Sequence, residues 1–226
     1  MSNSLTPKVM PDIRRLPFGE IVRCKLETLM PKDRVARLFS GQKLIVEEKM
    51  NGTSALFHAD GKRFIVFAED MLVCKPGLNT GVYHVPARFA IFDVFDTESK
   101  RFMCFLGKQD FLDMIKEGKV KFASKNGWDF FSVPNLGYGT FTPDQIVSLL
   151  DLKSRLAFDH KTNEPAYMEG VVVKPARELF LIEYEDLVAK LVRNEFLYGS
   201  SGIQENYRRL PTQHNKINPS FFQSDL

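Results

Sequence analysis

The chain has 226 residues, of which 44% are hydrophobic and 26% are charged, and this fits one compact domain with at most a small appendage. Its 31 basic and 28 acidic residues leave a net charge of +3, so the overall charge does not indicate a polyanion-binding protein and any such surface is local. No run of about 18 apolar residues occurs and the first residues lack a signal pattern, so we expect an intracellular, cytoplasmic protein without a membrane span.

Cysteine and histidine patterns do not point to a metal site or a disulfide framework. Cys24, Cys74 and Cys104 are scattered and form no C-x-x-C pair, so we interpret them as core thiols. The four histidines lack metal-ligand spacing. Groups of basic residues are candidates for phosphate contacts, although each alone is typical of a solvated face. They are Arg14–Arg15, Arg34 with Arg37 and Lys43, Lys116 with Lys119, Lys121 and Lys125, and Arg208–Arg209.

The first β-rich region covers residues 43–70. It reads KLIVEEK at 43–49, TSALFHA at 53–59 and KRFIVFAED at 62–70. Asp60-Gly61 separates the last two runs, and an Asp-Gly pair in that position is typical of a hairpin. RFAIFDVFD at 88–96 is apolar almost throughout, which predicts a strand covered on both faces.

Helices are predicted in two places further along the chain. One is a segment near 109–117. The other begins at Thr142, which caps Pro143 at the first helical position and has Gln145 three residues later, and we expect it to continue through IVSLLDLKSRLAF to 158.

The last predicted elements are a strand pair, MEGVVVKP at 168–175 and ELFLIEY at 178–184, followed by the stretch DLVAKLVRNEF at 186–196. The predicted class is therefore α+β, with antiparallel sheets flanked by helices.

Lys49 is the first candidate for chemistry. It ends an apolar strand and precedes Asn51-Gly52, a turn pair that tolerates positive φ. A surface lysine beside a turn is common, so its position alone does not indicate catalysis. Further short patterns follow it in a fixed order: K-x-N-G at 49–52, A-E-D at 68–70, F-A-I-F-D at 89–93, E-G-V-V-V-K at 169–174 and A-K-L-V-R at 189–193.

Together these patterns resemble the ordered motifs of ATP-dependent RNA and DNA ligases and mRNA capping enzymes. The resemblance covers about residues 43–196. It implies a nucleotidyltransferase domain with an ATP-grasp-like fold and a lysine that becomes covalently bonded to AMP. Asn51 occupies the place where the first motif usually has an aspartate, and asparagine also occurs there in some RNA-sealing members.

The resemblance assigns the nucleophile and its helpers. Lys49 attacks the α-phosphate of ATP and expels pyrophosphate. An ordinary lysine, with a pKa of about 10.4, is protonated at pH 7 and is a poor nucleophile. Lys174 and Lys190 correspond to lysines that contact the α-phosphate, and their charges would favour the neutral amine of Lys49 before ATP binds.

The remaining roles concern the metal and the nucleoside. Glu169 corresponds to the carboxylate that holds a divalent cation, Mg²⁺ or Mn²⁺, and Mg²⁺ suits hard oxygen ligands. Glu69 corresponds to the glutamate that binds the ribose. Phe92 would stack on adenine, and Phe89 is the alternative for this role. Packing in the core is the other interpretation of Phe92. We expect the strand and turn around Lys49 to complete the ATP site with Glu47, Glu48, Asn51 and Gly52.

One motif of the family is missing from its usual place. Most members carry an arginine between the lysine motif and the glutamate motif, and here Arg63 is the nearest candidate, although its position in the strand favours the wrong face. The engagement of the RNA end is the step that this departure affects most.

The length of the last segment favours the RNA ligase branch. An OB-fold needs five strands, and the residues after Lys190 are too few to form one. We therefore expect a nucleotidyltransferase domain at 1–196 without a C-terminal OB-fold and a short tail or cap at 197–226, in which Arg208 and Arg209 contact RNA. The expected reaction joins a 5′-phosphate and a 3′-hydroxyl RNA end. Alternatives are a DNA or nick-sealing ligase, a capping-type guanylyltransferase and a sealing-inactive nucleic-acid-binding relative.

Overall fold

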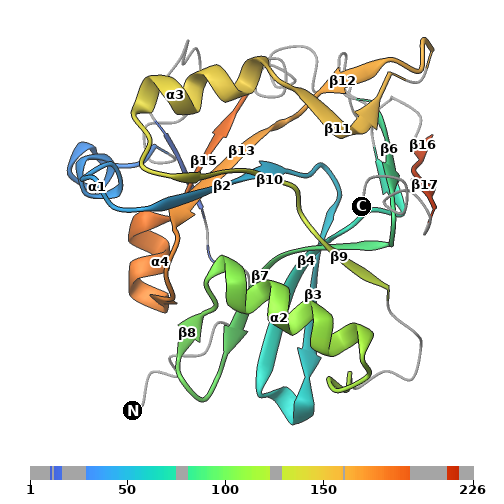
Figure 1. The fold of residues 1–226 in the computed structure, drawn as a ribbon, viewed down its shortest axis with the longest axis horizontal. Helices are drawn as coiled ribbons and strands as arrows, with labels where there is room; N and C mark the ends of the chain where they lie inside the picture. The colour runs from blue at the N-terminus through green and yellow to red at the C-terminus, as the bar shows by residue number, and fades with distance from the viewer. Residues whose placement is uncertain are drawn as a thin grey trace.

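Antiparallel sheets and four helices make up the described part of the chain (Figure 1). The computed structural model describes residues 11, 13–16, 29–74, 81–122, 129–159, 161–193 and 213–218. The combination of antiparallel sheets with helices confirms the predicted α+β class. None of the helices in these residues is long and apolar enough to cross a membrane. Arg208, Arg209 and the predicted domain boundary at 196 lie outside the described residues.

A five-stranded sheet, the central sheet, has the order β1-β15-β13-β2-β10. Its strands are β1 (Arg14–Arg15), β15 (Ala189–Val192), β13 (Gly170–Pro175), β2 (Leu44–Lys49) and β10 (Asn135–Gly139). All pairs are antiparallel except the parallel pair β1 and β15. A Cβ atom at Gly170 would lie 2.2 Å from the Leu191 carbonyl oxygen, so only glycine allows β13 and β15 to approach this closely.

A second sheet, the hairpin sheet, is built on the predicted hairpin. Its order is β14-β8-β7-β4-β3, and β9 pairs with β7. The strands are β3 (Thr53–Ala59), β4 (Phe64–Asp70), β7 (Phe89–Asp96), β8 (Arg101–Phe102), β9 (Phe130–Ser132) and β14 (Leu179–Phe180). Gly61 has a φ of 63° in the 3₁₀ turn between β3 and β4, which confirms the hairpin and the reason for its Asp-Gly pair.

Two smaller sheets lie beside these. They contain β6 (Val82–Val85), β11 (Lys153–Phe158), β12 (Pro165–Tyr167) and β17 (Lys216–Ile217), and β5 (Val73–Cys74) with β16 (Gln213–His214). The strands β16 and β17 bring residues 213–218 against β5 and β6.

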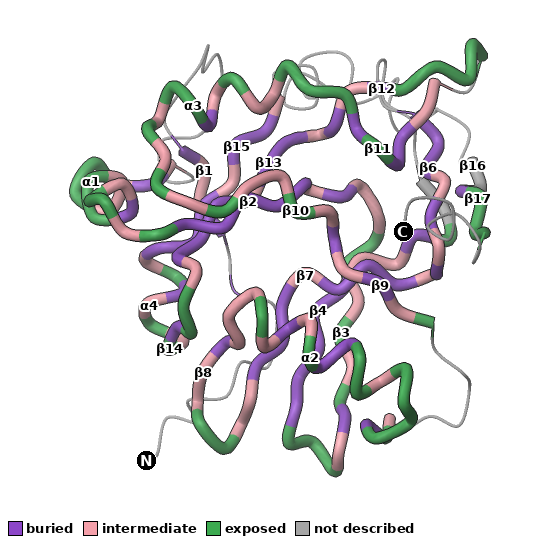
Figure 2. Tube along the Cα trace, in the orientation of Figure 1, coloured by how far each residue is buried: buried purple, intermediate pink, exposed green. Residues whose placement is uncertain are grey.

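Three of the described helices cover the outer faces of the two large sheets, and the fourth, α4 (Leu181–Leu187), packs in the cluster between the sheets. The buried segments in Figure 2 concentrate in the strands. The helices are α1 (Lys32–Leu38), α2 (Phe105–Lys116), α3 (Pro143–Ser148) and α4 (Leu181–Leu187). One face of the central sheet packs on α1 and α3. In β4, Phe64, Val66 and Ala68 face α2, while Ile65 and Phe67 face the cluster that contains Val172 of the central sheet.

Two predicted elements were wrong. The capping box at Thr142 is present, but the helix ends at Ser148 and residues 153–158 form β11. The segment 178–184 does not pair with β13: it forms the short strand β14 and enters α4, whereas the partners of β13 are β2 and β15. The predicted helix near 109–117 is present and begins earlier, at Phe105.

Candidate active site

A cavity of about 170 Å³ is lined by residues of the central sheet and the hairpin sheet. Its lining includes most of the residues that the sequence motifs single out. The residues are Ile13, Glu47, Glu48, Lys49, Met50, Ser54, Glu69, Phe92, Asp93, Val133, Val172, Lys174 and Lys190.

Strand register explains why residues far apart in the sequence meet here. Lys49 is opposite Gly170, and Val172 is opposite both Glu47 on β2 and Lys190 on β15. Since side chains alternate between faces along a strand, Glu47 and Lys49 emerge on the same face as Val172 and Lys190. The lysine motif and both later lysine motifs therefore contribute to one surface.

Lys49 forms an ion pair at the edge of this surface. Its Nζ lies 2.7 Å from Oε1 of Glu169, and the two side chains are 24% and 12% exposed. The second carboxylate oxygen of Glu169 is buried and has no hydrogen-bond partner within the described residues. Glu169 therefore has one oxygen engaged by Lys49 and one with unused capacity.

Glu69 lines the cavity, whereas Glu169 lies beside it through the ion pair with Lys49 and is not one of the lining residues. Glu69 follows Ile65 and Phe67 on the inner face of β4 and is opposite Ser54. Burial raises the pKa of Glu69 to about 7, and the charge of Lys49 opposes this shift. A Cβ atom at Gly52 would lie 2.7 Å from the Asp70 carbonyl oxygen and 3.1 Å from Cβ of Glu69. Gly52 thus allows the turn after Lys49 to lie against the end of β4.

Lys174 lies deeper in the cavity wall than Lys49. Its ammonium contacts Asp93 Oδ1 at 2.7 Å, Glu47 Oε2 at 2.8 Å and the Phe92 carbonyl oxygen at 3.0 Å. Burial alone would lower the pKa of Lys174, but the carboxylates of Asp93 and Glu47 outweigh this and raise it. Two hydrogen bonds, to Asp93 and to the Phe92 carbonyl oxygen, and an ion pair with Glu47 thus hold the Lys174 ammonium.

Lys108 completes this buried charge network. It is on α2, it is 2% exposed, and its Nζ donates to Oε1 of Glu47 and, at 3.2 Å, to the Phe92 carbonyl oxygen. Burial would raise the pKa of Glu47, but the charges of Lys108 and Lys174 hold it below its ordinary value. Tyr184 donates its hydroxyl proton to Asp93, so two cations, two anions and a phenol are mutually paired.

A bulge in β7 turns two consecutive residues toward the cavity. Phe67 is opposite Asp93, whereas the next residue of β4, Ala68, is opposite Ile91. Phe92 is therefore the additional residue in β7, and the irregularity lets Phe92 and Asp93 both line the cavity.

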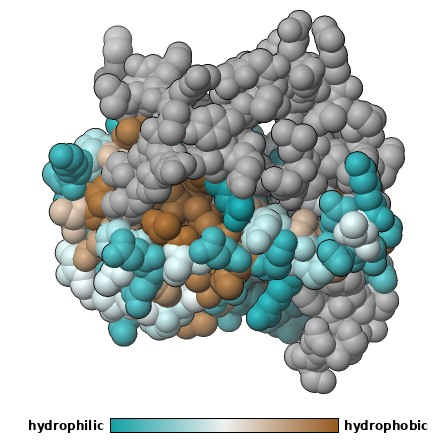
Figure 3. All heavy atoms as spheres, turned by 90° about the horizontal axis from the view of Figure 1, so that it is seen from above, coloured by the Kyte–Doolittle hydropathy of each residue, from teal (hydrophilic) through white to brown (hydrophobic). Residues whose placement is uncertain are grey.

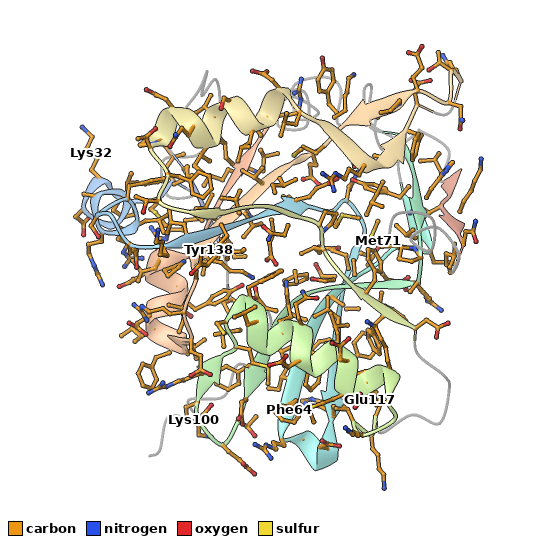
Figure 4. All side chains as sticks on the ribbon, viewed as in Figure 1. Lys32, Phe64, Met71, Lys100, Glu117 and Tyr138 are labelled. Carbon is orange, nitrogen blue, oxygen red and sulfur yellow. The ribbon has the colours of Figure 1, made fainter. Side chains whose placement is uncertain are left out.

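The structure does not bring Arg63 or Phe89 to the cavity. Arg63 lies beside Phe64 at the far end of β4 from Met71, as the labels in Figure 4 show, and pairs with Asp96 and Glu98. Phe89 packs in the cluster on the α2 side of the hairpin sheet. Asn51 is half-buried beside Lys49 and is not part of the lining.

Comparison with known protein families gives a match to the RNA ligase model over residues 58–192. The chain belongs to the RNA ligase family. No curated protein sequence matches this family member.

Solved RNA ligases from Naegleria gruberi are similar in structure. A mutant solved with AMP and manganese is 15% identical, with a TM-score of 0.50, and the match covers 86% of this chain and 58% of that one. The enzyme solved with pyrophosphate is 14% identical, with a TM-score of 0.48 and coverages of 88% and 63%. This RNA ligase family member thus spans about three fifths of those chains, and the likeness concerns the fold.

The carboxylates at the cavity fit a divalent cation that keeps most of its ligands from water and phosphate. Glu169 and Glu69 are the candidates, and Glu169 has the buried oxygen described above. The described residues contain no group of three or more His, Cys, Asp or Glu side chains that would hold a metal on its own. This donor set suits Mg²⁺, which binds through one or two carboxylates and substrate phosphates.

Motif reading missed Lys108 and Tyr184 and gave Asp93 no role. Lys108, Phe111 and Leu112 are the buried residues of α2, and their i, i+3, i+4 spacing places Lys108 on the apolar face of the helix. A lysine within an apolar helical stripe was the available signal. No signal in the sequence connected Tyr184 with Asp93.

Proposed function

We propose that this RNA ligase family member uses ATP to join a 5′-phosphate RNA end to a 3′-hydroxyl through an AMP adduct on Lys49. Lys49 Nζ attacks the α-phosphate of ATP, and pyrophosphate leaves. AMP then passes to the 5′-phosphate of RNA. The neighbouring 3′-hydroxyl attacks that phosphate, and AMP leaves as the phosphodiester forms.

The observation that supports this proposal best is the shared cavity around Lys49. The amine lies at a strand end, paired with Glu169, and Glu69, Phe92 and Lys190 line the same cavity. A nucleophile, a cation for phosphate, carboxylates for a metal or ribose, and an aromatic ring are the parts that adenylyl transfer needs.

Lys49 must lose a proton before it attacks. Glu169 is the carboxylate next to this amine, with its Oε1 2.7 Å from Nζ. Glu169, with Glu69 nearby, would hold Mg²⁺ or Mn²⁺ beside the phosphates, and its carboxylate would then no longer be engaged by the amine of Lys49. That ion supplies charge neutralisation on the phosphate oxygens. The presence of manganese with ATP or AMP in the Naegleria gruberi structures supports this assignment.

Lys190 and Lys174 have different roles in this proposal. Lys190 contacts the α-phosphate and stabilises the charge that develops on it. Lys174 is already engaged by two carboxylates and a carbonyl oxygen, so it fixes Asp93, Glu47 and the backbone at Phe92 instead of binding phosphate. Phe92 is then held where it stacks on adenine, and Glu69 binds the ribose.

The first prediction tests the nucleophile. With α-labelled ATP and magnesium, the parent protein should carry label on a denaturing gel, and Lys49→Ala should carry none because the P–N bond has no nucleophile. Lys43→Ala is a matched control, since Lys43 immediately precedes β2 and its carbonyl oxygen accepts from Ala176, and it should be labelled normally. Labelling of Lys49→Ala at the parental yield would refute the proposal.

A substrate panel separates the alternatives. Labelled ATP and GTP, each with nicked RNA and nicked DNA, should give adduct with ATP and sealing of RNA. GTP labelling would indicate a capping-type activity, and preferential sealing of nicked DNA a DNA ligase. An adduct without sealing of either polymer would indicate a sealing-inactive relative.

A further inference from the structure

Two cations lie over one aromatic ring close to the end of β15. Lys153 Nζ is 3.4 Å from the centroid of the Tyr167 ring, and the guanidinium carbon of Arg193 is 4.2 Å from the same centroid. We call these three residues the cation–tyrosine cluster. Lys153 is exposed, and Tyr167 and Arg193 are half-buried, so solvent reaches the cluster.

Three separate segments fix the cluster. Lys153 is opposite Tyr167 in the β11 and β12 pair. The Arg193 backbone N–H donates to the Glu169 carbonyl oxygen at 2.9 Å, and its side chain donates to the Leu150 carbonyl oxygen at 2.5 Å. Little side-chain freedom therefore remains to be lost when a ligand binds.

The strand β11 carries no carboxylate beside Lys153. Lys153 and Arg155 both lie on the exposed face of this strand, and neither forms a salt bridge in the part of the chain that the structure describes. Attraction to the ring face offsets part of the repulsion between Lys153 and Arg193. Figure 3, seen from above, shows hydrophilic residues on the right-hand side of the described surface.

The cluster is close to Lys49 in the sheet. Lys49, Gly170 and Val192 are neighbours across β2, β13 and β15, and Arg193 follows Val192. With strands about 4.8 Å apart, the Cα atom of Arg193 is about 10 Å from that of Lys49. The Arg193 side chain, however, leaves the sheet on the face of Leu191 and α3, opposite to the cavity face, where it contacts Leu150. A chain whose end reaches Lys49 can therefore place a nearby backbone phosphate at the cluster only if it passes around the ends of these strands.

We infer that Lys153, Tyr167 and Arg193 bind a backbone phosphate of the RNA strand a few nucleotides from the reacting end. The inference rests on the proposed function. An ammonium and a guanidinium bind phosphate oxygens through charge-assisted hydrogen bonds, and such contacts set the position of a strand without reading its sequence. The cluster would supply the RNA contact for which the sequence offered Arg63.

The test compares Lys153→Gln, Lys153→Arg and the parent protein. Lys153→Gln should weaken binding of a fluorescent 5′-phosphate RNA by about fivefold to tenfold and lower the salt dependence by about one ion. It should raise the KM for RNA in sealing, while labelling by ATP stays within about twofold of the parent. Lys153→Arg keeps the charge and should restore most of the binding.

Arg101→Gln is the matched control, because Arg101 also lies over a ring, that of Phe180, at 4.4 Å. It should leave RNA binding and sealing unchanged. Equal RNA binding by Lys153→Gln and the parent would overturn the inference, and so would an equal loss of ATP labelling and RNA binding. Absence of labelling in the parent would overturn the proposed function instead, and the RNA-binding titration would still decide the role of the cluster.

Discussion

Glu47 and Glu48 are adjacent in β2 but have opposite environments. Glu47 faces the hairpin sheet and is neutralised by Lys108 and Lys174. Glu48 faces the other way, where Ser154 donates to its Oε1 at 2.6 Å and its Oε2 is buried without a hydrogen-bond partner among the described residues. Burial raises the pKa of Glu48 to about 7 in spite of the hydrogen bond from Ser154.

This carboxyl should make stability depend on pH. Because the folded protein holds the proton of Glu48 more tightly than the unfolded chain, its contribution to the free energy of unfolding falls as pH rises from 4.5 to about 7. Glu48→Gln keeps an acceptor for Ser154 and removes this loss. We expect it to match the parent near pH 4 and to exceed it by about 3 kcal/mol at pH 8.

Urea denaturation at both pH values measures the effect. Glu164→Gln, at an exposed position, is the control and should leave the free energy of unfolding unchanged at both pH values. A constant difference between Glu48→Gln and the parent across this pH range would show that Glu48 does not titrate there.

At the scale of elements, α2 is tied to the central sheet by the charge of Lys108. Its other buried residues, Phe111 and Leu112, pack on the hairpin sheet, whereas Lys108 reaches Glu47 of β2. The helix therefore helps to hold the two sheets in register around the cavity.

Lys108→Met should lower the free energy of unfolding by about 3–5 kcal/mol, because it leaves the network with one uncompensated buried negative charge. Adding Glu47→Gln removes that charge, so the double variant should recover much of the loss. Lys116→Met on the exposed side of the same helix, where Lys116 pairs with Asp113, should change stability by at most about 0.5 kcal/mol. Chemical denaturation of the three variants gives the comparison, and a double variant no more stable than Lys108→Met would contradict the charge argument.

At the scale of the whole molecule, residues 213–218 link the end of the described chain to the segment after β4. Asn215 is buried, accepts from the Tyr83 N–H at 2.9 Å and donates to the Met71 carbonyl oxygen at 2.8 Å. This side chain connects β6 to the residue that follows Glu69 and Asp70.

Asn215→Ala should lower the free energy of unfolding by about 1–3 kcal/mol, because two buried backbone groups lose their partners. The neighbouring exposed residue offers a control, and Lys216→Ala should have little effect. Thermal and urea unfolding measure both variants. If Asn215→Ala were as stable as the parent, residues 213–218 would not be an integral part of the fold.

By itself, the sequence determined the α+β class, the hairpin at Asp60-Gly61, the helix cap at Thr142 and the family motifs around Lys49. These are local signals: turn chemistry, capping and the order of short motifs.

Only the tertiary structure determined that the helix stops at Ser148 and that residues 153–158 form the strand β11. Ser154 is buried and donates a hydrogen bond to Glu48. Because this inward position of β11 holds a serine and not an apolar residue, the sequence lacks the apolar–polar alternation that would have predicted a strand. The tertiary structure also determined that residues 178–184 enter a helix. There the Tyr184 ring stacks on the Phe102 ring, with 3.9 Å between the ring centroids, and the Tyr184 hydroxyl donates to Asp93.

The buried charge network likewise depends on contacts between segments that are distant in the sequence. Lys174 pairs with Asp93 and Glu47, and Lys108 completes the network. A buried charge is stable only beside its partner, and only the folded chain brings the two together.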